Sequence, residues 1–238
     1  MDDLTVYIGW DSREIIAYDV CEHSILRRHS ANTDLPIVPL IQNELRNSGL
    51  YTRPIDKKAS TEFSLTRFLT PALNKFEGFA IFADCDFLFL TDIVNVLELI
   101  DPQKAVSVVK HNYQPDERVK MDGAKQFNYP RKNWSSFMVF NCAHPANRAL
   151  SPETVNSATP AFLHRLSWLA DDDIGELPVS WNYLEGWYDP DGDPTLINAV
   201  HFTRGGPWFK HMQDVAFADL WLSELADFNS SSHKRRRA

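Results

Sequence analysis

The sequence predicts an α/β fold in which helices cover both faces of a central sheet. Short apolar runs rich in Val, Ile and Phe alternate along the chain with longer amphipathic segments, and this order is typical of a sheet built from strand–helix units. Aspartate or histidine side chains follow directly after several of these runs. Because ligands bind at the carboxyl ends of the strands in such sheets, the same pattern predicts where a functional site lies.

The first third of the chain opens with a strand, a sharp turn and a helix. Residues 4–8 (LTVYI) are the first predicted strand. Asp11 with Glu14 three residues later resembles a capping box and predicts a helix that ends near His29. Residues 36–40 are expected to form a second strand, and residues 60–73 a helix ending near Asn74.

The middle of the chain contains the most apolar strand. Residues 79–83 (FAIFA) have no polar side chain, which is typical of a strand covered on both faces. A helix is expected over residues 91–99 and strands over 105–109 and 136–141. Residues 111–133 between them have no clear period, and a loop of this length is usually functional or mobile.

The last part of the chain is expected to close the fold. Residues 151–169 predict a helix, residues 197–203 a strand that ends near His201, and residues 214–228 an amphipathic helix. The 238-residue chain has no internal repeat, so a single domain is predicted over residues 1–228. The basic segment 229–238 is predicted to be a disordered tail.

Composition and charge narrow the classes of function. The net charge of −8 argues against a nucleic-acid-binding protein, which is usually basic. Three widely spaced cysteines predict reduced thiols and a reducing compartment. Neither a secretory signal nor an apolar run of about 20 residues is evident, so a cytoplasmic location is expected. The basic tail could add weak contact with an anionic membrane surface.

The sharpest local motif is Asp84-Cys85-Asp86, directly after the apolar strand. Residues i and i+2 of an extended segment project to the same side, so both carboxylates face one point. Two close carboxylates repel each other unless a proton or a cation lies between them, and Mn²⁺ or Mg²⁺ suits oxygen ligands. Such an ion would bridge two phosphates of a nucleotide sugar and stabilise the leaving diphosphate. The structural alternative is a solvated turn that caps the next helix.

A second motif surrounds His201, which closes a predicted strand before Arg204-Gly205-Gly206-Pro207-Trp208. Imidazole can be a third ligand for Mn²⁺. Gly205 and Gly206 would let backbone N–H groups approach phosphate oxygens. Arg204 or Lys210 could add positive charge, whereas a structural role for His201 is the alternative.

Five segments together resemble the family 8 glycosyltransferases, which are retaining enzymes with a GT-A type fold. The resemblance runs from about residue 4 to 210. It rests on the apolar strand with Asp84 and Asp86, the Arg67-bearing stretch STEFSLTRFLTPAL, the strand WSSFMVFN ending at Asn141, Leu177-Pro178 with Trp181-Asn182, and AVHFTRGGPW.

The resemblance implies a GT-A type, Rossmann-like mixed sheet and a role for each site residue. It places Ile8, Gly9 and Asp11 at a uridine pocket, Arg67 against the donor, and Asp84, Asp86 and His201 around Mn²⁺. It also places Asn141, Asp171 and Asp172 near the sugar or acceptor. Residues 1–110 would be the nucleotide-sugar-binding half and residues 111–228 the half that shapes the site for a glycan or lipid-linked acceptor.

The chain departs from the family pattern at three points. Trp134-Ser135-Ser136 stands where Asn-Ser-Gly is usual, Gly206 where a Lys precedes Pro-Trp, and Asp171-Asp172-Asp173 where the family has an Asp-Gln-Asp-like element. Arg204 or Lys210 is a candidate replacement for the missing Lys. Asp171 or Asp172 is the candidate nucleophile of a double displacement, and front-side attack by the acceptor is the alternative.

Two other functions remain open from the sequence. One is a nucleotide-sugar hydrolase or nucleotidyltransferase that uses the same metal pocket, and the other is a UDP-binding relative without turnover. The first turn, Gly9-Trp10-Asp11-Ser12-Arg13, lacks the Gly-rich basic loop expected of a nucleotidyltransferase. The favoured hypothesis is a metal-dependent hexosyltransferase that uses a UDP-sugar.

Overall fold

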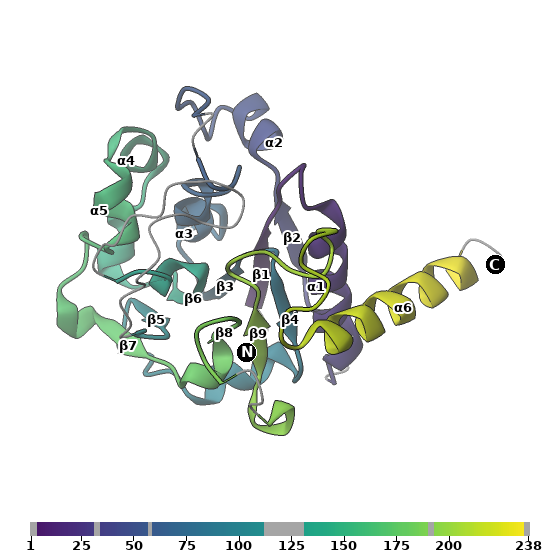
Figure 1. The fold of residues 1–238 in the computed structure, drawn as a ribbon. Helices are drawn as coiled ribbons and strands as arrows, with labels where there is room; N and C mark the ends of the chain where they lie inside the picture. Colours follow the sequence, from purple (N-terminus) through teal and green to yellow (C-terminus); the bar gives the residue numbers. More distant parts are fainter. Residues whose placement is uncertain (1–3, 31–33, 57–58, 112–130, 190–192, 236–238) are drawn as a thin grey trace.

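The computed structural model describes residues 4–30, 34–56, 59–111, 131–189 and 193–235 (Figure 1). A six-stranded sheet with the order β2-β1-β3-β6-β5-β7 forms the centre, and a three-stranded sheet, β4-β9-β8, lies beside it. The strands are β1 (Leu4–Gly9), β2 (Ile37–Leu40), β3 (Phe79–Ala83), β4 (Phe87–Phe89), β5 (Val106–Val108), β6 (Phe137–Asn141), β7 (Ile174–Glu176), β8 (Tyr183–Leu184) and β9 (Ala199–His201).

The direction of β6 makes the central sheet mixed. β1 runs parallel to β2 and β3, whereas β6 is antiparallel to both of its neighbours, β3 and β5. β7 is parallel to β5 and therefore points the same way as β3. The start of β6 consequently lies beside the carboxyl end of β3, with Phe137 opposite Ala83.

Helices lie around the sheets, as Figure 1 shows. In the figure α1 and α6 lie on one side of the central strands, and α4 and α5 lie on the other. The α-helices are α1 (Ile15–Arg28), α2 (Gln42–Asn47), α3 (Thr70–Leu73), α4 (Pro152–Ser157), α5 (Pro160–His164) and α6 (Ala218–Arg235). Short 3-10 helices are η1 (Thr66–Leu69), η2 (Ile93–Glu98), η3 (Trp134–Ser136), η4 (Pro145–Ala149), η5 (Asp171–Asp173), η6 (Val179–Trp181) and η7 (Pro194–Leu196).

The core forms where β3 and β6 pair. Ile81, Phe82 and Phe140 are fully buried, which confirms that the FAIFA run is a strand covered on both faces. A smaller apolar cluster around Trp221 joins α6 to the second sheet. The three cysteines are buried and unpaired, as predicted.

Several helix predictions are wrong in detail. The expected capping box does not form: Glu14 is the N-cap of α1 without a side-chain cap, and the Asp11 carboxylate binds Arg13 instead. Only residues 66–73 of the expected helix 60–73 are helical, and residues 93–98 form a 3-10 helix. The helix expected over 151–169 is interrupted because Pro160 starts a new helix, α5, capped by Thr159.

Other differences concern elements that the periodicity of apolar residues did not predict. β4, β7 and β8 are two or three residues long, too short for an alternation pattern to emerge. α6 continues to Arg235, so most of the segment expected to be a disordered tail is helical. Residues 112–130 of the predicted long loop lie outside the described residues. In the part of the chain that is described, no helix combines the length and apolar character needed to cross a bilayer.

Candidate metal centre

Two chain segments meet to form a cluster of Asp84, Asp86 and His201. The two aspartates occupy the turn between β3 and β4, and Cys85 between them points into the core. β4 pairs antiparallel with β9 in a register that puts Phe87 opposite His201. One ligand atom from each of the three side chains lies within 4.8 Å of the others. The structure therefore brings together the three predicted metal ligands.

The hydrogen bonds of Asn182 determine which nitrogen of His201 is protonated. Ser136 Oγ donates to the carbonyl of Asn133 (2.7 Å), so it must accept from Asn182 Nδ2 (2.9 Å). The remaining amide atom, Asn182 Oδ1, lies 2.8 Å from His201 Nδ1. An amide oxygen only accepts, so Nδ1 carries a proton.

His201 Nε2 is therefore the ring nitrogen that faces Asp86. The two atoms, His201 Nε2 and Asp86 Oδ1, are 3.3 Å apart. Asp86 Oδ1 is buried and has no hydrogen-bond donor among the described residues. A carboxylate oxygen and a ring nitrogen at this distance are favourable neighbours only with a proton or a cation between them. Two carboxylates and an oriented imidazole are a donor set that fits Mn²⁺ or Mg²⁺.

Arg67 holds the other carboxylate in place. Its Nη1 atom donates to Asp84 Oδ1 (2.7 Å) and to the carbonyl of Ser135 (2.8 Å), and its Nε donates to the carbonyl of Ser64 (3.1 Å). The guanidinium lies over the rings of Phe63 and Phe82. Burial raises the pKa of Asp84 to about 7 although Arg67 opposes the rise. All of these contacts of Arg67 are with other atoms of the chain. Its expected contact with the sugar-nucleotide donor remains a prediction.

Glu14 is a further acidic group that the sequence analysis assigned only to a helix cap. Its Oε2 atom accepts a hydrogen bond from Trp208 Nε1 (3.1 Å). Burial raises the pKa of Glu14 to about 7, and the nearby charges of Asp86 and Asp11 add to the rise. No sequence signal marks this role, because the contact joins residues 194 positions apart.

The turn after β1 is folded tightly onto the segment before Arg67. Asp11 is fully buried and accepts from the backbone N–H of Glu62 (3.0 Å) and from Arg13. These hydrogen bonds, together with that from the Arg13 N–H, lower the pKa of Asp11 against the effect of burial. A Cβ atom on Gly9 would lie 2.4 Å from the Phe63 ring. Ile8, Gly9 and Asp11 therefore lie together at and after the end of β1, and their expected contact with a uridine stays a prediction.

The loop after His201 depends on its two glycines. Gly205 has a φ of 109°, a left-handed conformation that favours glycine. A Cβ atom on Gly206 would lie 2.1 Å from the Trp208 ring. Arg204 lies over the ring of Trp187, and Lys210 is exposed. Gly206 thus serves the packing of Trp208, and Gly205 that of Met212 and Phe209. Their expected contact with phosphate remains a prediction.

Three predicted site residues stand at the opposite edge of the sheet. Asn141 pairs with Phe79, five residues before Asp84 along β3, which is roughly 16 Å at the rise of a strand. Its side chain donates to the carbonyl of Pro102. Asp171 and Asp172 precede β7, which points the same way as β3. Asp171 also forms an ion pair with Arg131, which precedes β6. The strand directions thus separate Asn141 from Asp84, and the expected contact of the three residues with the sugar or acceptor stays a prediction.

Ser135 and Ser136, at the start of β6, occupy the place expected for Asn141. The backbone N–H of Asp84 donates to the carbonyl of Ser136 (2.9 Å), and Asn182 reaches His201 through contacts already described. The sequence analysis used these residues only as parts of a family pattern. Locating these two serines at the site requires the antiparallel direction of β6. The local sequence does not encode that direction.

Comparisons with known proteins place the chain among relatives. No family model matches it. Protein CDI from Arabidopsis thaliana is 52% identical to it over 231 residues, which are 96% of this chain and 88% of that protein.

Solved glycosyltransferase structures share the fold at low identity. The apo structure of the WbbM bifunctional glycosyltransferase matches with a TM-score of 0.59 at 18% identity, and the chain spans 52% of its length. The glycosyltransferase GlyE of Streptococcus pneumoniae matches with a TM-score of 0.58 at 14% identity, over 97% of this chain and 63% of that one. The galactosyltransferase LgtC, in complex with donor and acceptor sugar analogs, matches with a TM-score of 0.56 at 11% identity, over 94% and 95% of the two chains. The fold is therefore of GT-A type.

Proposed function

The chain belongs to the family of Protein CDI from Arabidopsis thaliana and has a GT-A type fold, and on this basis we propose that it is a metal-dependent glycosyltransferase. It transfers a hexose from a UDP-sugar to a glycan or lipid-linked acceptor with retention of configuration, as the resemblance to family 8 implies. Fold alone does not decide chemistry, so the proposal depends on the metal centre.

The observation that carries the proposal is the paired arrangement of Asp86 and His201. Asn182 holds His201 so that Nε2 faces a buried Asp86 oxygen, which has no hydrogen-bond partner among the described residues. Asp84 adds a second carboxylate within 4.8 Å. These residues would hold Mn²⁺ or Mg²⁺, which supplies positive charge that stabilises a leaving diphosphate.

The remaining residues orient the groups that react. Arg67 holds Asp84 in one orientation through a short ion pair, and Asn182 does the same for His201. Such outer contacts commonly change metal affinity or activity by about 10–100-fold when they are removed. Ile8, Gly9 and Asp11 are proposed to contact the uridine, and Arg204 or Lys210 the diphosphate. Since Asp171 and Asp172 stand at the other edge of the sheet, front-side attack is favoured over a double displacement.

The first test is calorimetric titration of UDP into the protein with Mn²⁺ and with EDTA. Wild-type protein should bind UDP only with the metal. In Asp86→Asn that affinity should fall by at least about 100-fold, because loss of a direct ligand should cost no less than loss of an outer contact. Asp214→Asn is the matched control, since Asp214 is exposed and does not belong to the cluster.

Three outcomes would argue against parts of the proposal. UDP binding that is indifferent to EDTA would remove the metal from the donor site. No UDP binding under any condition would remove the glycosyltransferase assignment while leaving the fold intact. Release of free sugar from a UDP-hexose at the same rate with and without acceptors would instead identify a hydrolase.

A further inference from the structure

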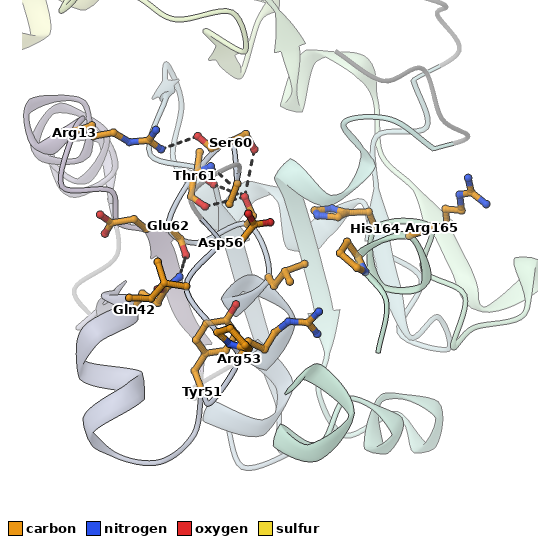
Figure 2. Close-up of a pocket in the computed structure, with 17 residues that line it drawn as sticks. Arg13, Gln42, Tyr51, Arg53, Asp56, Ser60, Thr61, Glu62, His164 and Arg165 are labelled. Atoms are coloured by element: carbon orange, nitrogen blue, oxygen red, sulfur yellow. Dashed lines mark hydrogen bonds between the residues drawn. The ribbon is translucent and has the colours of Figure 1, made fainter. Parts of the chain in front are cut away.

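A cavity of about 610 Å³ lies beside the metal centre (Figure 2). It is bounded by Arg13, by Gln42 of α2, by residues 51–56 and 59–65, and by α5 with Arg165. This volume falls in the range of about 300–1,000 Å³ that is typical of small-molecule sites. None of the residues that bind the metal lines it, so it is a separate compartment.

Arg67 is the partition between the cavity and the metal centre. At one end its Nε binds the carbonyl of Ser64, which lines the cavity, and at the other its Nη1 binds Asp84. A second link runs from His164 in the cavity wall to Ser135 Oγ (2.9 Å), and the carbonyl of Ser135 is bound by the same guanidinium. The cavity is thus one arginine side chain away from a metal-ligand carboxylate.

The lining offers hydrogen-bonding groups together with apolar surface. Figure 2 shows Ser60 and Thr61 at one end, close to Arg13, and Tyr51 with Arg53 at the other. Apolar side chains complete the wall, among them Pro54, Pro160 and Ile55, whose side chain is 74% exposed. A sugar ring presents hydroxyl groups at its edge and C–H groups on its faces, so it matches a wall of this mixed kind.

The charges of the lining are largely satisfied by the protein. Arg13 forms an ion pair with Asp11 at 2.6 Å. Arg53 donates from Nη1 to the carbonyls of Val155 (2.9 Å) and Ala158 (2.7 Å). Arg165 is a third cation of the lining, and the carboxylates of Asp56 and Glu62 lie in the same wall. With Arg13 paired to Asp11, two cations and two carboxylates of the lining remain. A nearly balanced lining gives a charged ligand no net attraction, and this favours an uncharged polyol over a phosphate or a carboxylate.

We propose that this cavity is the acceptor site and that it takes an uncharged glycan. The acceptor role of this cavity rests on the proposed function. That the cavity binds a carbohydrate is inferred from its volume and lining alone. The glycan chain would lie toward residues 51–56 and α5, with its reactive end at Ser64, the lining residue that Arg67 contacts.

The test uses a variant that fills the cavity. Ala161 is an exposed residue of α5 that lines it, so Ala161→Trp should block it without disturbing the core. Ala226→Trp, at an exposed position of α6, is the matched control. Saturation-transfer NMR would be measured with lactose, maltose and cellobiose, and with glucuronate and glucose 6-phosphate, both with UDP and Mn²⁺ and in EDTA.

At least one neutral disaccharide should give saturation transfer with the wild type and with Ala226→Trp, and the signal should be lost in Ala161→Trp. UDP affinity should be the same in all three proteins. Persistence of the signal in Ala161→Trp, stronger binding of the charged sugars, or silence of the whole panel would overturn the proposal. A parallel loss of UDP affinity would assign the cavity to the donor instead. Failure of UDP to bind the wild type would contradict the proposed function alone, because the EDTA arm measures glycan binding separately.

Discussion

At the scale of single residues, the orientation of the proposed metal ligands depends on side chains that are not ligands themselves. Asn182 is fully buried and hydrogen-bonds both Ser136 and His201. It binds Nδ1 of His201 and therefore leaves Nε2 as the nitrogen that faces Asp86. A His at the end of a strand is an ordinary structural residue unless such a partner aims it.

Replacing Asn182 should weaken metal binding without removing a ligand. In Asn182→Ala the imidazole can rotate or change tautomer, so Mn²⁺ affinity should fall by about 10–100-fold. The measurement is the free Mn²⁺ signal in electron paramagnetic resonance during titration. Asn95→Ala, at an exposed position, serves as the control. Equal affinity in Asn182→Ala and wild type would show that Asn182 does not orient His201 for metal binding.

At the scale of elements, buried polar contacts dock helices at the ends of the molecule. α6 is attached to α1 through Glu224, which is 2% exposed and contacts His23, Arg27 and Arg28. α5 is attached next to the metal centre through His164, which bonds Ser135 and lies edge-on to Phe68 at 5.3 Å. Both contacts fix the position of the helix, because a buried charge or polar atom without a partner would lower the free energy of unfolding.

The docking of α5 should make stability depend on pH. Burial lowers the pKa of His164 to about 3, with help from the Arg67 charge. The unfolded chain, with the ordinary value of 6.5, therefore binds more protons between these limits. The stabilisation that neutral His164 contributes is fully present above pH 6.5 and is lost as the pH falls toward 3. The loss of folding free energy is about 2 kcal/mol at pH 5.

Urea unfolding at pH 7.5 and pH 5 of wild type and His164→Gln measures this effect. Glutamine does not titrate, so the loss of stability on acidification should be smaller in the variant by about 2 kcal/mol. Buried His111, whose pKa burial also lowers to about 3, should keep part of the loss in both proteins. An equal loss in the two proteins would show that His164 is not buried in its neutral form.

At the scale of the whole molecule, the order and direction of the strands decide which residues meet. The carboxyl ends of β1 and β3 and the start of β6 share one edge, where Asp84 and Asp86 lie. β4 and β9 then bring His201 to the same place from more than a hundred residues along the chain. Asn141 and the acidic run 171–173 are sent to the other edge by the same topology.

This topology predicts that distant variants do not affect the donor site. Asn141→Ala and Asp172→Ala should each leave UDP affinity with Mn²⁺ within about twofold of wild type, because substitutions more than about 10 Å apart act independently. Calorimetry under the conditions used for Asp86→Asn measures both. A tenfold loss in either variant would contradict the predicted independence of that residue from the donor site.

The sequence by itself determined the local elements with strong patterns. The β1 run, the FAIFA strand and the pair Asp84 and Asp86 could be recognised because burial and side-chain alternation are encoded in neighbouring residues. The metal ligands could be proposed for the same reason, since two of them are two residues apart and the third ends a strand.

Only the tertiary structure decided the direction of β6 and β7, the contact of Glu14 with Trp208, the role of Asn182 and the cavity beside Arg67. Strand direction depends on which segments pair across the sheet, and both parallel and antiparallel partners have the same local pattern. The contacts of Glu14 and Asn182 arise from packing between segments far apart in the chain. No period of two or 3.6 residues carries information of that kind, so these features had to await the fold.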